Sequence, residues 1–488
     1  MDLIRGIKNN ENIRESLIEL KNDIHVAQKI KSDLELKDKL IELLTHEDPK
    51  VRKNSASLLG YYSNVFDVLF HAYLQEKTEY VKEAYLKGMS MQDCHEHIHE
   101  LKYIQHQLLN SEDKETKHVQ AQLKRLHPLL LKNQPHKKKV LKLSHEPVDV
   151  VLTSLPYYQF VIFESVLHLK YKPVNQGVLV RTTSLYDIVN IRSYKDLLIP
   201  LSGASSMNID LEDIVAGMKR CHLIELLDRL YGDAFPFYYR IVDGLREKNP
   251  QLIKKISEKV FELYPHQLLN ATESYDIEIV FKEVRKGKVN AYLSLPDFKG
   301  TRFQYRKETI PTAMQPYVAA TLVQLAKPYF VPHAKVLDPF VGSGVLLIER
   351  NTEKETQFSM GIDIYGKGIE IARKHAKNAN QTIYFVQKDV MRFVNHEMFD
   401  EVITDMPTLA QMKNEVLLKE LYDRFFERLK RLVRPGGYIF LYTSEIALIR
   451  KNLRLHEGYL ALEEHYEIPR GKNMFYFFII RMKKNYNE

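Results

Sequence analysis

The sequence predicts a multidomain protein with an all-α first part, an α+β middle part and an α/β last part. Residues 1–132 show helical periodicity with little glycine or proline, and from Val148 onward short runs rich in β-branched residues begin. In the last third, an apolar run that ends at Asp338 is followed by the glycine turn 340–344 and a leucine-rich helical stretch. A strand, a glycine turn and a helix in this order are typical of a doubly wound sheet.

Length and composition fit a globular protein of several domains. The 488 residues are too many for one ordinary core, and the contents of 44% hydrophobic and 27% charged residues are those of a soluble protein. We expect no secretory signal, because the N-terminus leads into Asn and Glu rather than an apolar core. We expect no membrane association, because no apolar run is long enough to span a bilayer. Cys94 and Cys221 cannot build a disulfide framework, which favours the cytoplasm. The formal charge of +8 is compatible with a polyanionic partner but does not identify one.

The first 132 residues predict a stack of short helices. The informative stretch is 46–60, in which Asp-Pro suits a helix start and a glycine suits its end. This stretch resembles a HEAT repeat unit, and 79–88 looks like a second copy in which Val81 aligns with Val51. The resemblance implies a surface for a protein partner or RNA. A plain helical bundle is the alternative.

A cysteine and histidine cluster and a basic stretch stand out in and after this helical part. Cys94, His95, His97 and His99 form a cluster, but no second pair of ligands lies at a spacing known for metal sites. We therefore predict a solvated surface there and no metal. Residues 133–146 are polar and basic and contain a proline, which predicts a linker.

Residues 147–300 predict the α+β domain. Residues 236–242 read as a strand, 250–263 as a basic amphipathic helix, and 275–282 with 287–294 as a pair of strands. This order of elements resembles the THUMP domain, an RNA-binding module that accompanies several RNA-modifying enzymes. The resemblance implies contact with RNA. An unrelated ferredoxin-like domain is the alternative.

The glycine turn after Asp338 predicts a nucleotide-type pocket. Gly342 and Gly344 lack a Cβ, so a ligand can approach the backbone closely. The turn has neither the Gly-Lys-Ser/Thr of a P-loop nor the G-x-G-x-x-G of a dinucleotide fingerprint. An acid at the strand tip repels phosphate and suits hydroxyls or a cation. These features favour S-adenosylmethionine (SAM), which is cationic and has no phosphates, over an ordinary βα turn without a ligand.

Two stretches before this turn extend the pattern. Arg302-Phe-Gln-Tyr-Arg306 and a helix that starts near Pro311 precede the turn in an order similar to that of THUMP-containing RNA guanine-N2 methyltransferases and their ribosomal-RNA relatives. The resemblance covers roughly residues 148–482. It implies that residues 301–488 are a class I, Rossmann-like SAM-dependent methyltransferase domain acting on RNA, with tRNA as the first expectation and rRNA as the second.

Acids also end the next two predicted strands. Asp363 follows an apolar run and could accept hydrogen bonds from both ribose hydroxyls, with Ile364 on the adenine face. Asp389 follows the third run and could accept from the adenine amino group. Three acids in order at strand tips are a stronger signal than any one of them. The expected cofactor-binding residues are Asp338, Pro339, Phe340, Gly342, Gly344, Asp363, Ile364, Asp389 and Val390.

The fourth predicted strand carries the catalytic candidates, Asp405 and Pro407. In the family that the chain resembles, this position reads Asp/Asn-Pro-Pro-Tyr/Phe, where the acid or amide accepts hydrogen bonds from the target amine and the ring stacks on the flipped base. Here Met406 stands in place of the first proline and Thr408 in place of the aromatic residue. The mechanism implied is direct displacement without a metal.

A threonine cannot stack on a base, which leaves three interpretations. The base is held by another aromatic residue, such as Tyr305 or one in the loop after Thr408; or the target atom differs; or the protein is a non-catalytic SAM-binding or RNA-binding adaptor that docks partners on its helical repeats. We favour the first, with Tyr305 and Arg306 as the expected substrate-binding residues.

Overall fold

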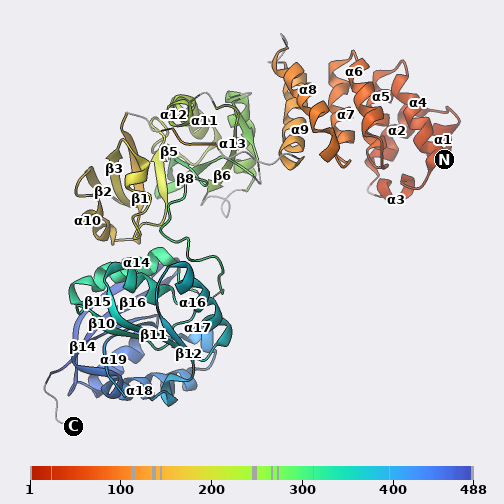
Figure 1. Cartoon of the computed structure of the whole chain (residues 1–488). Coiled ribbons are helices and arrows are strands. Elements are labelled where there is room, and N and C mark those ends of the chain that lie inside the picture. Colours follow the sequence, from red (N-terminus) through yellow and green to blue (C-terminus); the bar gives the residue numbers. More distant parts are fainter. Residues whose placement is uncertain are drawn as a thin grey trace. The chain divides into compact units, whose positions relative to one another are not determined.

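The computed structural model describes residues 3–484, apart from residues 24, 112–115, 134–138, 143–145, 233, 244–249, 265–266, 272–273, 312 and 395 (Figure 1). The chain divides into two compact units, the first made of Met1–Lys142 and Leu201–Ala291, the second of Leu143–Pro200 and Tyr292–Glu488. The middle of the sequence therefore contributes to both units. The predicted domain boundaries stay predictions, and much of the predicted linker 133–146 lies outside the described residues.

The described residues between 3 and 133 form a series of helices, as the periodicity predicts. Their apolar faces share one core, which contains residues of each described helix from α1 to α9. None of the helices that the structure describes has the length and apolarity to cross a membrane. The helices are α1 (Leu3–Lys8), α2 (Ile13–Asn22), α3 (Val26–Ile30), α4 (Leu34–Glu42), α5 (Pro49–Leu59), α6 (Phe66–Gln75), α7 (Glu79–Met89), α8 (Ile98–Leu109) and α9 (Lys117–Asn133).

Helices α5 and α7, which belong to the two predicted repeat copies, pack closely where each copy has its glycine. A Cβ on Gly88 would lie 2.6 Å from the carbonyl oxygen of Ala56, and a Cβ on Gly60 would lie 2.9 Å from the Cα of Gly88. A side chain at either position would push the two helices apart. The resemblance of this region to HEAT repeats itself stays a prediction.

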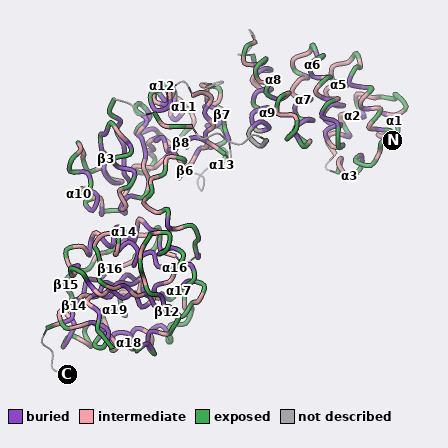
Figure 2. Tube along the Cα trace, in the orientation of Figure 1, coloured by how far each residue is buried: buried purple, intermediate pink, exposed green. Residues whose placement is uncertain are grey.

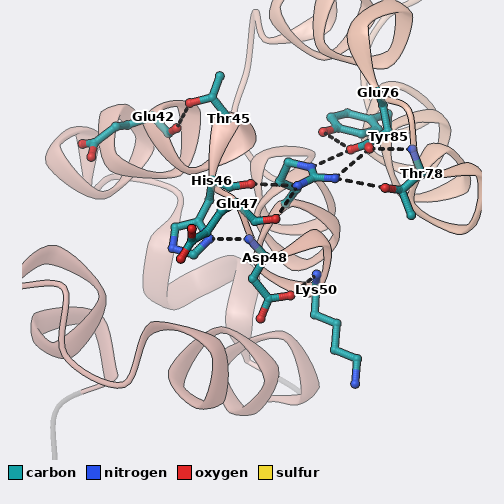
Figure 3. A network of polar contacts seen from close by, with 10 residues as sticks. Glu42, Thr45, His46, Glu47, Asp48, Lys50, Glu76, Thr78 and Tyr85 are labelled. Carbon is teal, nitrogen blue, oxygen red and sulfur yellow. Dashed lines mark hydrogen bonds and ion pairs between the residues drawn. The ribbon is translucent and has the colours of Figure 1, made fainter.

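A polar network connects the start of α5 with the turn before α7 (Figure 3). The Arg52 guanidinium donates two hydrogen bonds of 2.8 Å to Glu76, and one each to the carbonyl oxygens of His46 and Glu47 at 2.8 and 3.0 Å. Burial alone would raise the pKa of Glu76, but the hydrogen bonds from Arg52 and from the Thr78 amide hold it below its usual value. Because both charged groups are fully hydrogen-bonded, this pair can be tolerated in a half-buried place.

The residues of the cysteine and histidine cluster differ in their surroundings, and some of them pack in the protein. The His97 ring stacks on Phe66 with 3.9 Å between the ring centres, and the buried Cys94 thiol donates to the Met89 carbonyl oxygen at 3.1 Å. Across the described residues, no group of three or more His, Cys, Asp or Glu side chains is arranged to hold a metal ion.

The rest of the first unit is a small sheet with helices. Strand β6 is parallel to β7 and β8, and β5 is antiparallel to β9. The strand, helix and strand pair follow one another in the order that the sequence predicts. The elements are β5 (Met207–Asn208), α11 (Leu211–Arg220), α12 (Leu223–Tyr231), β6 (Phe237–Asp243), α13 (Pro250–Leu263), β7 (Leu268–Asn270), β8 (Ile277–Arg285) and β9 (Lys288–Ser294), the last of which ends in the second unit.

The second unit begins with a small antiparallel sheet in the order β2-β3-β1-β4. Strand β1 pairs along its whole length with β3, from Val148 opposite Thr182 to Thr153 opposite Gly177. The elements are β1 (Val148–Thr153), α10 (Phe163–Val166), β2 (Lys170–Val174), β3 (Gly177–Thr182) and β4 (Leu197–Pro200).

The C-terminal part is a seven-stranded sheet in the order β12-β11-β10-β13-β14-β16-β15, with helices on both faces (Figure 1). The first five of these strands are parallel, and β16 is antiparallel to both of its neighbours. The central strands are buried (Figure 2). The elements are α14 (Pro316–Ala326), β10 (Ala334–Asp338), α15 (Val345–Glu353), β11 (Thr356–Asp363), α16 (Gly366–Asn378), β12 (Tyr384–Gln387), β13 (Phe399–Asp405), α17 (Leu409–Met412), α18 (Glu415–Leu432), β14 (Val433–Thr443), α19 (Ile446–Leu455), β15 (Leu460–Arg470) and β16 (Asn473–Met482).

An ion pair with no exposed surface fixes α15 against β13. Arg350 donates to the two carboxylate oxygens of Glu401 at 2.7 and 2.9 Å and to the Lys354 carbonyl oxygen at 2.8 Å. The Val331 amide also donates to Glu401, at 2.6 Å. A buried pair with several partners is held in one geometry. The helix after the glycine turn is therefore held against the strand that ends in Asp405.

Candidate active site

A cavity of about 630 Å³ opens at the carboxyl ends of β10, β11, β12 and β13. Parallel strands bring their carboxyl ends to one edge of the sheet, so residues far apart in the sequence meet there. The predicted residues that line this cavity are Asp338, Pro339, Phe340, Gly342, Asp363, Ile364, Asp389, Val390, Asp405 and Pro407. Gly344, Tyr305 and Arg306 are not among its lining residues.

The two glycines of the turn have different roles. Gly342 has a φ of +50° and open space where a Cβ would be, and its amide donates to Asp363 at 2.8 Å. Gly344 has a φ of +78°, and a Cβ there would lie 3.2 Å from the Cβ of Ala372 in α16. Gly342 therefore leaves the backbone open to the cavity, whereas Gly344 allows the turn to pack against α16.

Asp338 is buried at the base of the cavity. Its carboxylate accepts hydrogen bonds from the Thr404 hydroxyl at 2.6 Å and from the Phe340 amide at 3.1 Å. Burial raises the pKa of Asp338 to about 8, and the charges of Asp363 and Asp405 act in the same direction. Several carboxylates that share one cavity are stabilised by a cation. This donor set therefore fits a positively charged ligand such as SAM.

The side of the cavity at β11 and β12 combines acids with apolar surface. The Asp363 carboxylate accepts from the amides of Gly342 and Tyr365 at 2.8 Å each, and each oxygen can accept a further hydrogen bond. Ile364 is 71% exposed although it is apolar, as an open ligand face would be. Asp389 accepts from the Met391 amide at 2.8 Å. The arrangement fits a ribose and an adenine ring.

Asp405 lies at the end of β13 on the same cavity. Burial raises the pKa of Asp405 to about 7, and the charge of Arg470 opposes that rise. The next residue, Met406, is fully buried in the core, and its amide donates to the Tyr442 carbonyl oxygen at 2.9 Å. The carbonyl oxygen of Pro407 accepts from the Tyr422 hydroxyl at 2.9 Å. Asp405 is thus the ionisable side chain of this stretch that lines the cavity, and the contacts of the two residues after it fix the backbone there.

Thr408 caps a helix. Its backbone amide donates to the Gln411 side chain at 2.9 Å, and its own hydroxyl completes a capping box at the start of α17. The loop after Thr408 was one expected source of a stacking ring, yet residues 409–414 contain no aromatic residue. The residues that depart from the family pattern, Met406 and Thr408, therefore have structural roles here.

Neither of the expected substrate-binding residues, Tyr305 and Arg306, lines the cavity. The burial of Tyr305 corrects its assignment as a stacking ring, whereas a role of Arg306 in substrate binding stays a prediction. Tyr305 is only 5% exposed, and its hydroxyl donates to Glu349 at 2.7 Å. Burial raises the pKa of Tyr305, and the Glu349 charge adds to this effect. Arg306 donates to the Gln315 side chain at 3.3 Å. A buried ring whose hydroxyl is bound to a carboxylate is not available to stack on a base.

Sequence reasoning missed a charged cluster outside the lining of the cavity. Arg192 donates two hydrogen bonds to Glu349, at 2.6 and 2.7 Å, and Glu349 lies in α15 with only 2% of its surface exposed. Arg302 donates to the carbonyl oxygens of Ile191 and Tyr194 at 3.0 and 2.7 Å. One local signal was present: Glu349 and Arg350 directly follow the apolar residues 345–348 of this helix, and charged residues beside an apolar run indicate buried ionic partners.

Comparison with known proteins agrees with this geometry. Residues 304–460 match the family described as UPF0020, the RMKL-like methyltransferase domain. The tRNA (guanine(6)-N2)-methyltransferase of Thermus thermophilus is 27% identical over 153 residues, which are 31% of this chain and 45% of that protein. The chain thus spans about half the length of this curated relative.

Solved structures show the fold. TrmN from Thermus thermophilus is similar with a TM-score of 0.52 at 19% identity, over 69% of this chain and 100% of TrmN. The protein SMU.472, complexed with SAH, is similar with a TM-score of 0.51 at 14% identity, over 70% of this chain and 100% of SMU.472. With the matched family and the acid-lined cavity, these likenesses lead to one conclusion: the C-terminal part of this chain is a class I, SAM-dependent methyltransferase domain.

Proposed function

We propose that this protein methylates RNA, and that its target is the exocyclic N2 of a guanine in tRNA. The observation that carries the proposal is the position of Asp405, which shares one cavity with Asp338, Asp363 and Asp389. A carboxylate at this point can contact an amine that faces the cofactor. The likeness to a tRNA guanine-N2 methyltransferase supports RNA as the substrate class and N2 as the target atom.

Different residues of the cavity are proposed to bind different parts of the cofactor. We propose that Asp363 accepts hydrogen bonds from the ribose hydroxyls, that Ile364 and Val390 contact the adenine ring, and that Asp389 accepts from its amino group. The acids around Asp338 favour a ligand that carries a positive charge. When bound, SAM supplies a methyl group that its sulfonium has already activated.

Asp405 performs the chemistry that the protein itself must supply. Its carboxylate accepts a hydrogen bond from the guanine amine, which directs the nitrogen toward the cofactor side of the cavity. The amine loses a proton when its nitrogen forms the new bond to carbon, and Asp405 can take that proton. A pKa of about 7 suits this role, because the group is partly ionised at neutral pH and is a stronger base than an ordinary carboxylate.

The middle of the chain is proposed to bind the RNA. The likeness to TrmN covers 69% of the chain, far more than residues 304–460, so it extends beyond the methyltransferase domain. The order β6, α13, β7, β8 and β9 supports the assignment of residues 147–300 as a THUMP domain. We further propose that the helical residues 1–132 offer a HEAT-like surface for a protein partner.

The test is transfer of label from SAM to RNA isolated from cells that lack the gene. The tRNA and rRNA fractions are incubated separately with purified protein, and the labelled nucleoside is identified by mass spectrometry. Labelled N2-methylguanosine from tRNA supports the proposal, and the same product from rRNA alone changes the substrate. Met406 and Thr408 favour a second candidate, a SAM-binding adaptor without catalysis, which predicts cofactor binding and no transfer to either fraction.

A further inference from the structure

Asp405 borders the cofactor cavity on one side only. On the other side, β14 runs parallel to β13, and Asp405 is paired in register with Tyr442. The Tyr442 ring is fully buried and stacks on the Phe475 ring, with 5.1 Å between the ring centres and 13° between the planes. The strands on the side of β13 away from β10 thus carry a pair of stacked aromatic rings, one of them on the residue paired with Asp405.

The hairpin formed by β15 and β16 lies beyond these rings, at the same edge of the sheet. β14 ends at Thr443, which is paired with Tyr476, and β16 runs antiparallel to it. The residues of β16 before Tyr476, including Phe475, therefore extend past the end of β14. Arg470, the last residue of β15, is paired with Asn473. The tip of the β15–β16 hairpin is thus on the edge that carries Asp405.

Arg470 is the cation of this hairpin that acts on Asp405. Its guanidinium carbon lies 4.9 Å from the centre of the Phe475 ring. Its charge opposes the effect of burial on the pKa of both Asp405 and Tyr442. Arg470 and Phe475 are each only partly buried, and neither lines the cofactor cavity.

We propose that Arg470, supported by Phe475, is the nucleotide-binding side of the active site and holds the target guanine beside Asp405. This inference rests on the proposed function, which it deepens. A guanidinium plane and an aromatic ring are the groups on which flipped RNA bases stack. Thr408 cannot stack, Tyr305 is buried, and residues 409–414 have no ring. The aromatic residues that line the cavity, Phe340 and Tyr365, follow β10 and β11 on the cofactor side, so Arg470 with Phe475 takes the place of the missing aromatic residue.

The charge of Arg470 adds a second effect. A nucleotide brings a phosphate, and a planar guanidinium can bind it while the base packs on the same group. The same cation favours the ionised form of Asp405, which is the form that accepts a proton. Arg470 therefore both holds the base and favours the form of Asp405 that accepts the proton.

The experiment compares Arg470→Ala, Arg470→Lys and Phe475→Leu with Lys472→Ala, which removes a cation from the exposed tip of the same hairpin. SAM binding is measured by calorimetry, and single-turnover transfer is measured on the tRNA fraction from cells that lack the gene. We expect Arg470→Ala to lower kcat/KM for RNA by roughly 10- to 100-fold, in line with the loss of a base-stacking group worth about 1–3 kcal/mol. Its affinity for SAM should stay within about twofold of wild type, which also shows that the fold is intact.

The controls separate the inference from the function on which it rests. Lysine keeps the charge but not the plane, so Arg470→Lys should recover only a small part of the loss, and Phe475→Leu should lower kcat/KM in the same way. Wild-type activity in Arg470→Ala, or an equal loss in Lys472→Ala, overturns the inference while the proposed function stands. Absence of transfer by the wild-type protein overturns the proposed function and this assignment together.

Discussion

Arg192 and Glu349 are 157 positions apart in the sequence, yet their side chains are joined by two hydrogen bonds of 2.6 and 2.7 Å. Glu349 also accepts from the Tyr305 hydroxyl at 2.7 Å, so its carboxylate has three donors. Burial raises the pKa of Glu349, and the bonds from Arg192 and Tyr305 oppose this. The helix that begins at the glycine turn is thereby tied to the segment that precedes β4.

Removal of Arg192 should destabilise the protein strongly. Arg192→Ala leaves Glu349 buried without its cation, which costs about 3–5 kcal/mol in the free energy of unfolding. The double variant Arg192→Met with Glu349→Leu should lose less, because no charge is left buried. Urea unfolding of the full chain measures both. Lys335→Ala, which breaks an exposed pair with Glu397, is the matched control and should cost no more than about 1 kcal/mol. Equal losses for Arg192→Ala and Lys335→Ala would contradict the account.

Asp405 should control transfer without controlling cofactor binding. Asp405→Ala removes the acceptor of the amine hydrogen bond and proton, and transfer should fall about 10²- to 10⁴-fold. SAM affinity measured by calorimetry should change by no more than a few-fold. Asp405→Asn keeps a hydrogen-bond acceptor but cannot take a proton, so its activity should lie between those of wild type and Asp405→Ala. Transfer at the wild-type rate by Asp405→Ala would sink the catalytic assignment.

The rate should depend on pH through the same residue. The base must be ionised, and burial raises the pKa of Asp405 to about 7. In the wild-type protein, kcat/KM should therefore rise with pH up to about 7 and then level off. The Asp405→Asn variant should lack this rise. A wild-type profile that is flat between pH 5.5 and 8, measured under saturating SAM, would exclude Asp405 as the proton acceptor.

The raised pKa values should also make stability depend on pH. Asp338 and Asp405 bind protons more tightly in the folded chain, with pKa values of about 8 and about 7, than in the unfolded chain. The folded form therefore holds more protons between about pH 4 and pH 8, and its stability should fall as the pH rises through this range. Asp338→Asn removes the larger effect, so its melting temperature should fall less than that of wild type between pH 5 and pH 8. Melting temperatures that fall by the same amount between pH 5 and pH 8 in the two proteins would refute this.

SAM and SAH should respond to pH differently at this site. The sulfonium charge of SAM favours the ionised forms of Asp338 and Asp405, and SAH lacks that charge. Between pH 6 and pH 8 the ratio of SAM affinity to SAH affinity should rise several-fold. Calorimetric titration of both ligands at the two pH values measures the ratio. A constant ratio would mean that the carboxylates do not sense the charge of the ligand.

Thr408 should affect stability more than activity. Its capping box begins α17, and loss of such a cap costs about 0.5–2 kcal/mol. Thr408→Ala should therefore unfold at a lower urea concentration, whereas Thr408→Ser, which keeps the hydroxyl, should be close to wild type. Transfer by Thr408→Ala should stay near the wild-type rate. A large loss of transfer with unchanged stability would assign Thr408 to the substrate instead.

The acids of the cavity could be predicted because the sequence repeats one local pattern. Each of Asp338, Asp363, Asp389 and Asp405 follows a short apolar run, and parallel strands must bring such positions to a common edge. Nothing local distinguishes a buried aromatic residue from an exposed one in a loop, which is why Tyr305 was assigned to the substrate. The partner of its hydroxyl, Glu349, is 44 residues away.

Contacts between residues that are far apart in the sequence could not be predicted from it either. Arg192 meets Glu349, and Arg470 approaches Asp405, only because the sheet order brings their strands and loops together. Met406 and Thr408 could be identified as departures from the family pattern, but their roles in the core and in the helix cap depend on neighbours that the pattern does not name.

The second unit is assembled from two stretches of sequence, 143–200 and 292–488, with 201–291 between them in the chain. This arrangement limits the positions at which the chain can be truncated. A fragment that starts at residue 301 would contain every acid of the cavity but would have lost Arg192, the partner of Glu349. A catalytic fragment should therefore start before Val148 and carry residues 201–291 as an insertion, or replace them with a short link from Pro200 to Tyr292.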